Sequence, residues 1–177
     1  SAMPITGVSL SFNIDQIGNS NLLFGKVTAD SSTYVLEWNG SSNVWDWMIG
    51  ETGSSDSSNY LVDITGDSNT MDLDQGSLVS ADRLDFDLTV LGSSNVFDVD
   101  IETNDVTWNM DITGASNNIN TLQKDANYHS LTMELNGDGA DVDINQLSGT
   151  CPTGINTCKG IITLDITSDN STIQINQ

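Results

Sequence analysis

The sequence predicts an all-β chain that folds as a two-sheet β-solenoid of about seven strand–turn–strand rungs. Two observations lead to this prediction. A short Gly-x-Ser-Asn phrase recurs along the chain, and alternating apolar and polar residues flank every copy. Alternation places one face of a strand against a core, and internal repetition is typical of repeat architectures. The 177 residues are enough for one continuous core.

The repeats also predict the domain organisation. Residues 1–3 are interpreted as an expression scar, and 4–177 as a single repeat domain. Gly and Asn in each four-residue turn can adopt the positive φ angles that a tight reversal requires. The expected rungs are residues 8–26, 32–49, 58–75, 84–102, 105–122, 129–146 and 160–177.

The turn phrase supplies a numbering for equivalent places, counted forwards and backwards from the residue that opens each turn. Five clear copies occur, and degenerate copies open at Gly137 and Ser168. Stacked asparagine side chains can hydrogen-bond along a parallel stack, so we expect a structural turn ladder. Its members are Gly18, Asn21, Gly40, Asn43, Gly66, Asn69, Gly92, Asn95, Gly114 and Asn117.

Equivalent places carry similar residues, which favours strands stacked in parallel over the alternative of a sandwich or meander of antiparallel hairpins. In a solenoid, like residues stack about 4.8 Å apart and each rung buries its apolar face against its neighbours. Trp38, Trp45 and Trp47 are therefore expected in the core rather than on a ligand platform. The sixth place before the turn holds Phe12, Tyr34, Tyr60, Phe86, Trp108, Leu131 and Ile162.

The charge balance restricts the partners. The formal net charge is −21, from 25 acidic and four basic residues. Nucleic acid and anionic membrane surfaces would repel such a chain, whereas cations would be attracted. No apolar run is long enough to cross a bilayer, so we expect neither nucleic-acid binding nor membrane insertion.

Acidic residues form columns of their own, mainly three places before the turn and six places after it. Stacking would set these carboxylates about 5 Å apart, which raises pKa values or recruits cations. A solvated acidic surface is one interpretation, and Ca²⁺ binding is the other, because Ca²⁺ prefers clustered carboxylate oxygens. No cofactor is required. The candidate metal ligands are Asp72, Asp74, Asp98 and Asp100.

Two cysteines, Cys151 and Cys158, close together in a polar segment, predict a local disulfide and an oxidising, secreted location. A metal site at this pair is disfavoured because the single histidine, His129, lies far upstream. We expect that histidine to pack at the end of a rung.

The segment from Phe12 through Ile14, Gln16 and Gly18 to Asn21 resembles the curlin repeat of bacterial curli-type amyloid fibres. As a pattern, the resemblance spans about 8–177. It implies secretion, a surface or biofilm role, and rung-by-rung stacking. The chain departs from the family in its aliphatic and Trp-rich core and in its two cysteines. The inward Gln before the turn survives only at Gln16, and the second Gln of the motif has an echo at Gln75 alone.

These features together predict an extracellular structural or adhesive surface protein, a fibre or biofilm-matrix component. Such a protein would stack end to end with itself or with other fibre subunits. The alternative is a cation-dependent binding module for polysaccharide or a partner protein. We expect no enzyme, because basic residues are scarce and two short strands per rung offer little cleft. Ice binding is disfavoured because the row of threonines beside the turns is broken.

Overall fold

The computed structural model describes residues 5–50, 57–75, 81–126, 128–148 and 159–177. All regular structure in these ranges is β-strand, as predicted. The strands are β1 (Ile5–Val8), β2 (Ser11–Ile17), β3 (Leu22–Asp30), β4 (Thr33–Asn39), β5 (Val44–Ile49), β6 (Ser58–Thr65), β7 (Thr70–Gln75), β8 (Ala81–Leu91), β9 (Val96–Thr113), β10 (Asn118–Ala126), β11 (Tyr128–Asn136), β12 (Asp141–Ser148), β13 (Lys159–Thr167) and β14 (Thr172–Asn176).

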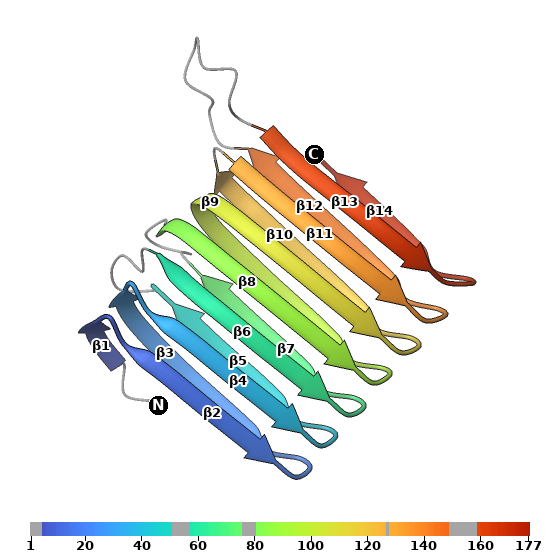
Figure 1. The fold of residues 1–177 in the computed structure, drawn as a ribbon, viewed down its shortest axis with the longest axis horizontal. Helices are drawn as coiled ribbons and strands as arrows, with labels where there is room; N and C mark the ends of the chain where they lie inside the picture. The colour runs from blue at the N-terminus through green and yellow to red at the C-terminus, as the bar shows by residue number, and fades with distance from the viewer. Residues whose placement is uncertain (1–4, 51–56, 76–80, 127, 149–158) are drawn as a thin grey trace.

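The strands form two sheets in which every pairing is parallel, so the solenoid is confirmed and the antiparallel meander is not formed. Sheet A stacks β1, β3, β5, β7, the first half of β9, β10, β12 and β14. Sheet B stacks β2, β4, β6, β8, the second half of β9, β11 and β13. The described strands make seven strand–turn–strand rungs, with all the turns along one side (Figure 1).

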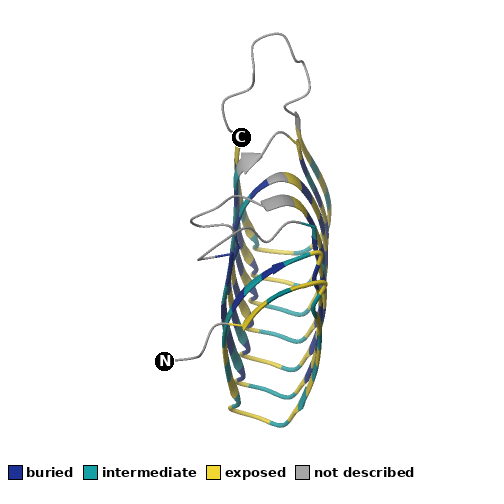
Figure 2. Ribbon diagram, turned by 90° about the vertical axis from the view of Figure 1, so that its left-hand side faces the viewer, coloured by how far each residue is buried: buried dark blue, intermediate teal, exposed yellow. Residues whose placement is uncertain are grey.

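The register follows the turn phrase. The seven residues six places before the turn pair in one unbroken column from Phe12 in β2 to Ile162 in β13. Seen from the side in Figure 2, the two sheets face each other as two walls. Because a strand alternates its side chains, this register turns the apolar places inward along both walls.

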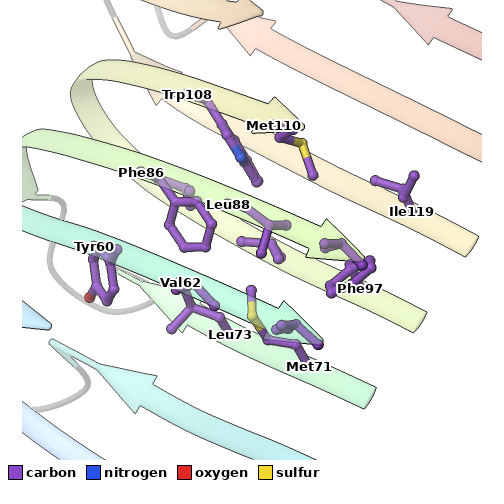
Figure 3. Close-up of a cluster of buried hydrophobic side chains, with 14 of the residues drawn as sticks. Tyr60, Val62, Met71, Leu73, Phe86, Leu88, Phe97, Trp108, Met110 and Ile119 are labelled. Atoms are coloured by element: carbon purple, nitrogen blue, oxygen red, sulfur yellow. The ribbon is translucent and has the colours of Figure 1, made fainter. Parts of the chain in front are cut away.

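The core lies between the walls and runs along the stack. Figure 3 shows Tyr60, Phe86 and Trp108 one above the other on successive rungs of sheet B. Trp38, Trp45 and Trp47 are buried as expected. Space for the ring of Trp47 comes from a neighbouring glycine, because a Cβ at Gly25 would lie 2.7 Å from that ring. Large and small residues thus alternate to fill the core without strain.

Two elements differ from the sequence prediction. β9 runs without a break from sheet A into sheet B, where a separation between 102 and 105 was expected. Thr103 is buried at this passage, and its hydroxyl donates a 3.0 Å hydrogen bond to the carbonyl of Asp105. β1 was not predicted, because four mostly exposed residues without a turn phrase carry no periodic signal. It pairs only with Val27–Asp30 of β3.

Candidate functional site: turn ladders, acidic face and end rungs

Each of the first six turns is built by two residues with positive φ angles. The opening glycines have φ between 118° and 154°, as expected. The second such residue is the serine two places later, as at Ser20, Ser42 and Ser68, with φ near 60°. The expectation that the closing asparagine supplies this angle was wrong. The serine turns the backbone, which leaves the asparagine side chain available for hydrogen bonding between rungs.

The opening glycines are also required by close stacking. A Cβ at Gly40, Gly66, Gly92, Gly114 or Gly137 would lie 2.0–2.2 Å from the carbonyl oxygen of the glycine in the preceding rung. Real Cβ atoms do not approach a backbone oxygen so closely. The glycine column therefore fixes how tightly one turn sits on the next.

The closing asparagines form a ladder inside the turn. The backbone N–H of Asn21 donates to Oδ1 of Asn43 at 2.9 Å, and the bond repeats from Asn43 to Asn69, from Asn69 to Asn95 and from Asn95 to Asn117 at 2.8–2.9 Å. The four acceptor residues are buried. Each rung therefore donates to the side chain of the rung that follows it. These four bonds join backbone to side chain. The expected bond between stacked amide groups is present at one step, where Asn95 Nδ2 donates to Asn117 Oδ1 at 3.3 Å.

A second ladder, which the sequence reasoning missed, runs along the outside of the turns and in the opposite direction. The N–H of Ser41 donates to Oδ1 of Asn19 at 2.7 Å, and the N–H of Asp169 donates to a carboxylate oxygen of Asp138 at 2.8 Å. Here each rung accepts from the rung that follows it. The signal was available, because most residues one place after the turn opening are Asn, Ser or Asp.

Glutamines also share an inward column, nine places after the turn opening. Tyr60 donates its hydroxyl hydrogen to Oε1 of Gln75. Gln146 Nε2 donates to Gln123 Oε1 at 2.7 Å, and Gln177 Nε2 donates to Gln146 Oε1 at 3.1 Å. The second motif glutamine is therefore not confined to Gln75, and that expectation was wrong. It was missed because Ile101 interrupts the column between Gln75 and Gln123.

His129 lies in the interior beside this column. Its side chain is buried. In sheet B, His129 pairs with Val106 of β9 on one side and with Gly160 of β13 on the other. Burial lowers the pKa of the imidazole below its ordinary value. His129 is therefore a buried, neutral imidazole near the start of β11, which is the packing position at the end of a rung that the sequence predicted.

The acidic face lies on the outside of sheet A in the middle rungs. Asp46, Asp72 and Asp98 pair in one column, and Asp74 pairs with Asp100 two places further along the strands. Burial and then the neighbouring carboxylates raise the pKa of Asp72 and Asp74, and raise that of Asp100 to about 6.

Polar neighbours border the acidic face on the side of β10. The side-chain amide of Asn120 donates to Asp98 at 2.9 Å, and Lys124 forms an ion pair with Glu102 at 2.7 Å. The first and last rungs carry Phe24 and Gln174 in the column of Asp72. The acidic face is therefore a feature of the middle of the stack.

The four predicted Ca²⁺ ligands, Asp72, Asp74, Asp98 and Asp100, do lie together on the neighbouring strands β7 and β9. Within the described ranges, however, no group of three or more His, Cys, Asp or Glu side chains is arranged to hold a metal ion. Side chains of one column stand side by side on a pleated sheet instead of converging on a point. Calcium binding stays a prediction.

The end rungs differ from all the others because they pair on one side only. In the part of the chain that the structure describes, β2, the Leu22–Gly25 part of β3, β13 and β14 each pair with a neighbouring strand on one side only. Core residues that are fully buried elsewhere are half-buried here. A groove lined by Ile162, Leu164 and Ile175 opens on the last rung, and Ile175 is 43% exposed.

The predicted disulfide between Cys151 and Cys158 lies outside the described residues. The described ranges contain no long apolar helix of the kind that crosses a membrane. Comparison of the chain with protein-family models, curated proteins and solved structures gives no match.

Proposed function

We propose that the protein is an extracellular structural or adhesive surface protein, a fibre or biofilm-matrix component that assembles through its end rungs. The observation that carries the proposal is the state of those rungs. Among the described residues, both have strand edges without a neighbouring strand beside half-buried core residues such as Phe12, Ile14 and Leu164. A free edge next to an apolar surface is a template for the addition of another strand.

The energetics of the stack support end-to-end growth. Each inner rung is stabilised only by its two neighbours, so a repeat protein gains stability with every interface that it adds. Joining two ends would bury the same apolar columns that are buried between inner rungs. Burial of apolar surface contributes roughly 25 cal/mol per Å², which favours association of the exposed ends.

The outer faces fit a scaffold better than a catalyst. They are pleated surfaces on which short Asp, Asn, Ser and Thr side chains predominate, with single exposed apolar side chains such as Phe24, Leu61 and Leu91 among them, and they carry many like charges. Such a surface keeps a β-rich rod soluble and prevents lateral sticking of sheets. We therefore propose a protein without enzymatic activity, secreted into an oxidising environment where Cys151 and Cys158 can form their disulfide.

A second candidate function, a cation-dependent binding module for polysaccharide or a partner protein, is favoured by one observation. Burial, and then the crowding of carboxylates on the acidic face, raises the pKa of Asp72, Asp74 and Asp100. A divalent cation would relieve this repulsion. Calorimetric titration with Ca²⁺ tests this, with Asp74→Asn plus Asp100→Asn as the variant that should lose the binding heat. Equal heats for wild type and variant would reject a site on this face.

Sedimentation velocity of the protein tests the leading proposal. We expect concentration-dependent species larger than the monomer, with more assembly at pH 4 than at pH 7, because protonation removes repulsion between the rods. Millimolar Ca²⁺ at pH 7 should act in the same direction. A monomer under all three conditions and at every concentration would contradict assembly through the ends.

A further inference from the structure

We infer that two copies join head to tail in the register of the inner rungs. The last rung of one copy, β13–turn–β14, stacks on the first rung of the next, β2–turn–β3. The turn that opens at Ser168 then lies on the turn that opens at Gly18. This inference depends on the proposed assembly through the ends, and it specifies the polarity, the register and the contacting residues of the joint.

The backbone hydrogen bonds of the turns set the polarity. Within the chain, the N–H at the turn opening donates to a carbonyl of the following rung, as from Gly18 to Asn39 at 3.0 Å and from Gly137 to Thr167 at 3.0 Å. The N–H two places later does the same, as from Gly139 to Asp169 at 3.0 Å. The next donors in this series are the N–H groups of Ser168 and Asn170. In the joint, their acceptors are the carbonyls of Ile17 and Asn19 of the second copy.

The two side-chain ladders continue across the same joint. The inner ladder needs a side-chain oxygen on the following rung, and the second copy offers Oδ1 of Asn21 to the N–H of Ser171. The outer ladder needs a side-chain oxygen on the preceding rung, and Asp169 offers its carboxylate to the N–H of Asn19. The ladders run in opposite directions, so only a parallel, head-to-tail joint completes both.

The end rungs carry the side-chain hydrogen-bond acceptors that both ladders need, although two inner rungs lack one of these acceptors. Ala115 interrupts the outer ladder and Ala140 interrupts the inner one, since alanine has no side-chain acceptor. After the second interruption the inner ladder resumes, because the N–H of Ala140 donates to Oγ of Ser171 at 3.0 Å. Asn21 and Asp169, whose side chains would face a neighbouring copy, both keep an oxygen acceptor.

The shapes of the two ends are compatible. Gly18 has a φ of +118°, like the inner glycines, and leaves room for the carbonyl of a preceding turn. In sheet A, β1 pairs with Val27–Asp30 of β3, whereas Thr172–Ile175 of β14 lie in the columns of Leu22–Gly25. These two parts of the edge of β3 do not overlap.

The apolar columns also continue. Ile162 would stack on Phe12, Leu164 on Ile14 and Ile173 on Leu23, all of which are half-buried in the single chain. On the outer faces Asp165 would lie next to Asp15. Among the described strand residues of the joint, this is the one pair of like charges. Salt weakens the repulsion of such an exposed pair.

A disulfide between engineered cysteines tests the register directly. Ile17 and Thr167 occupy the same exposed place in the first and last rungs. Stacked residues in neighbouring strands lie about 4.8 Å apart, within the range that a disulfide spans. The double variant Ile17→Cys plus Thr167→Cys, oxidised after assembly, should give a ladder of covalent oligomers, and mass spectrometry should identify the 17–167 link. The matched control, Ile17→Cys plus Asp165→Cys, is two places out of register and should cross-link at least about tenfold less.

The possible outcomes separate the inference from the function on which it depends. Assemblies in which 17–17 or 167–167 links dominate, or in which the control links as well as the test pair, would overturn the head-to-tail register while leaving assembly intact. Absence of any assembly in sedimentation and electron microscopy would overturn the proposed function together with the joint.

Single variants provide a second measurement that does not depend on engineered cysteines. Asn21→Ala and Asp169→Ala each remove one hydrogen bond of the joint, so the concentration at which assembly begins should rise about five- to tenfold. Asn13→Ala, an exposed change in the same rung as Asn21, is the matched control and should leave that concentration unchanged. Equal effects of Asn13→Ala and Asn21→Ala would contradict the assigned contacts.

Discussion

The middle and the end rungs carry the same residue pattern, but they differ in how deeply it is buried. Phe86 in the fourth rung is fully buried, whereas Phe12, six places before the turn like Phe86, is half-buried in the first. The exposure pattern of β2 is repeated in β13, at the other end of the stack. The difference therefore comes from a missing neighbour rather than from the sequence of the rung. In this fold, an end rung has the same residue pattern as an inner rung but lacks one of the two interfaces with neighbouring rungs.

The largest expected effect comes from truncating the same aromatic residue in both settings. Phe86→Ala should lower the free energy of unfolding by about 3–5 kcal/mol, because it leaves a cavity between fixed rungs. Phe12→Ala should cost about 1–2 kcal/mol, since the side chain is already partly exposed to water. Urea denaturation of both variants measures the difference, and equal losses would contradict the comparison.

The glycine column provides the next contrast. Gly66→Ala would place a Cβ 2.1 Å from the carbonyl oxygen of Gly40 and should destabilise the fold by more than about 3 kcal/mol, because two turns must move apart. Gly18→Ala meets no backbone atom of another rung and should cost only about 1 kcal/mol, from its positive φ. Thermal unfolding compares them, and a more harmful change at Gly18 would refute this account of the turns.

Removal of a ladder acceptor should have a smaller effect. Asn69→Ala leaves the buried N–H of Asn43 without its 2.9 Å partner, which should cost about 1–3 kcal/mol. Asn21→Ala removes an acceptor whose donor would belong to a preceding rung, so the monomer should lose less than about 0.5 kcal/mol. Denaturation at a concentration too low for assembly isolates the two values. A loss at Asn21 as large as that at Asn69 would show that Asn21 already has an equivalent role within the chain.

The smallest effect concerns the acidic face, which only the middle rungs possess. The pKa of Asp100 is raised to about 6, so the folded state binds this proton more tightly than the unfolded state does. Stability should therefore rise as the pH falls from 7 through 6 towards the ordinary carboxyl pKa. Asp100→Asn should raise the melting temperature at pH 7 and flatten this dependence, by an amount below about 1 kcal/mol because solvent screens the exposed group.

The matched control for this change is Asp165→Asn, which removes one negative charge from an end rung on the other sheet. A similar gain for both variants would mean that net charge alone, and not crowding on the acidic face, controls the pH dependence.

The sequence was sufficient to predict the solenoid, because the turn phrase sets the register and each column from Phe12 to Ile162 repeats one chemical type. It was not sufficient for features that depend on the path of the backbone. In the first five turns serine, rather than the closing asparagine, adopts the left-handed conformation, and β9 crosses between the sheets without a break. Local residue preferences do not specify these details, because stacking on neighbouring rungs decides them.

The candidate sites were predicted to different extents. The acidic residues could be located because Asp72, Asp74, Asp98 and Asp100 follow from the register. The outer ladder and the glutamine column were within reach of the same column analysis, but Ala115 and Ile101 interrupt them. The match between the two end rungs could not be predicted from the sequence. It depends on the direction of each hydrogen bond in the ladders, and composition and periodicity do not specify that direction.

Hydrogen–deuterium exchange, measured residue by residue on the monomer and on the assembled protein, tests the central claim most directly. The account predicts that amides of β2 and β13 exchange much faster than those of β6 and β8 in the monomer, and that assembly brings both end strands to the protection of the middle. End strands that are already as protected as β6 in the monomer, or that stay unprotected after assembly, would contradict it.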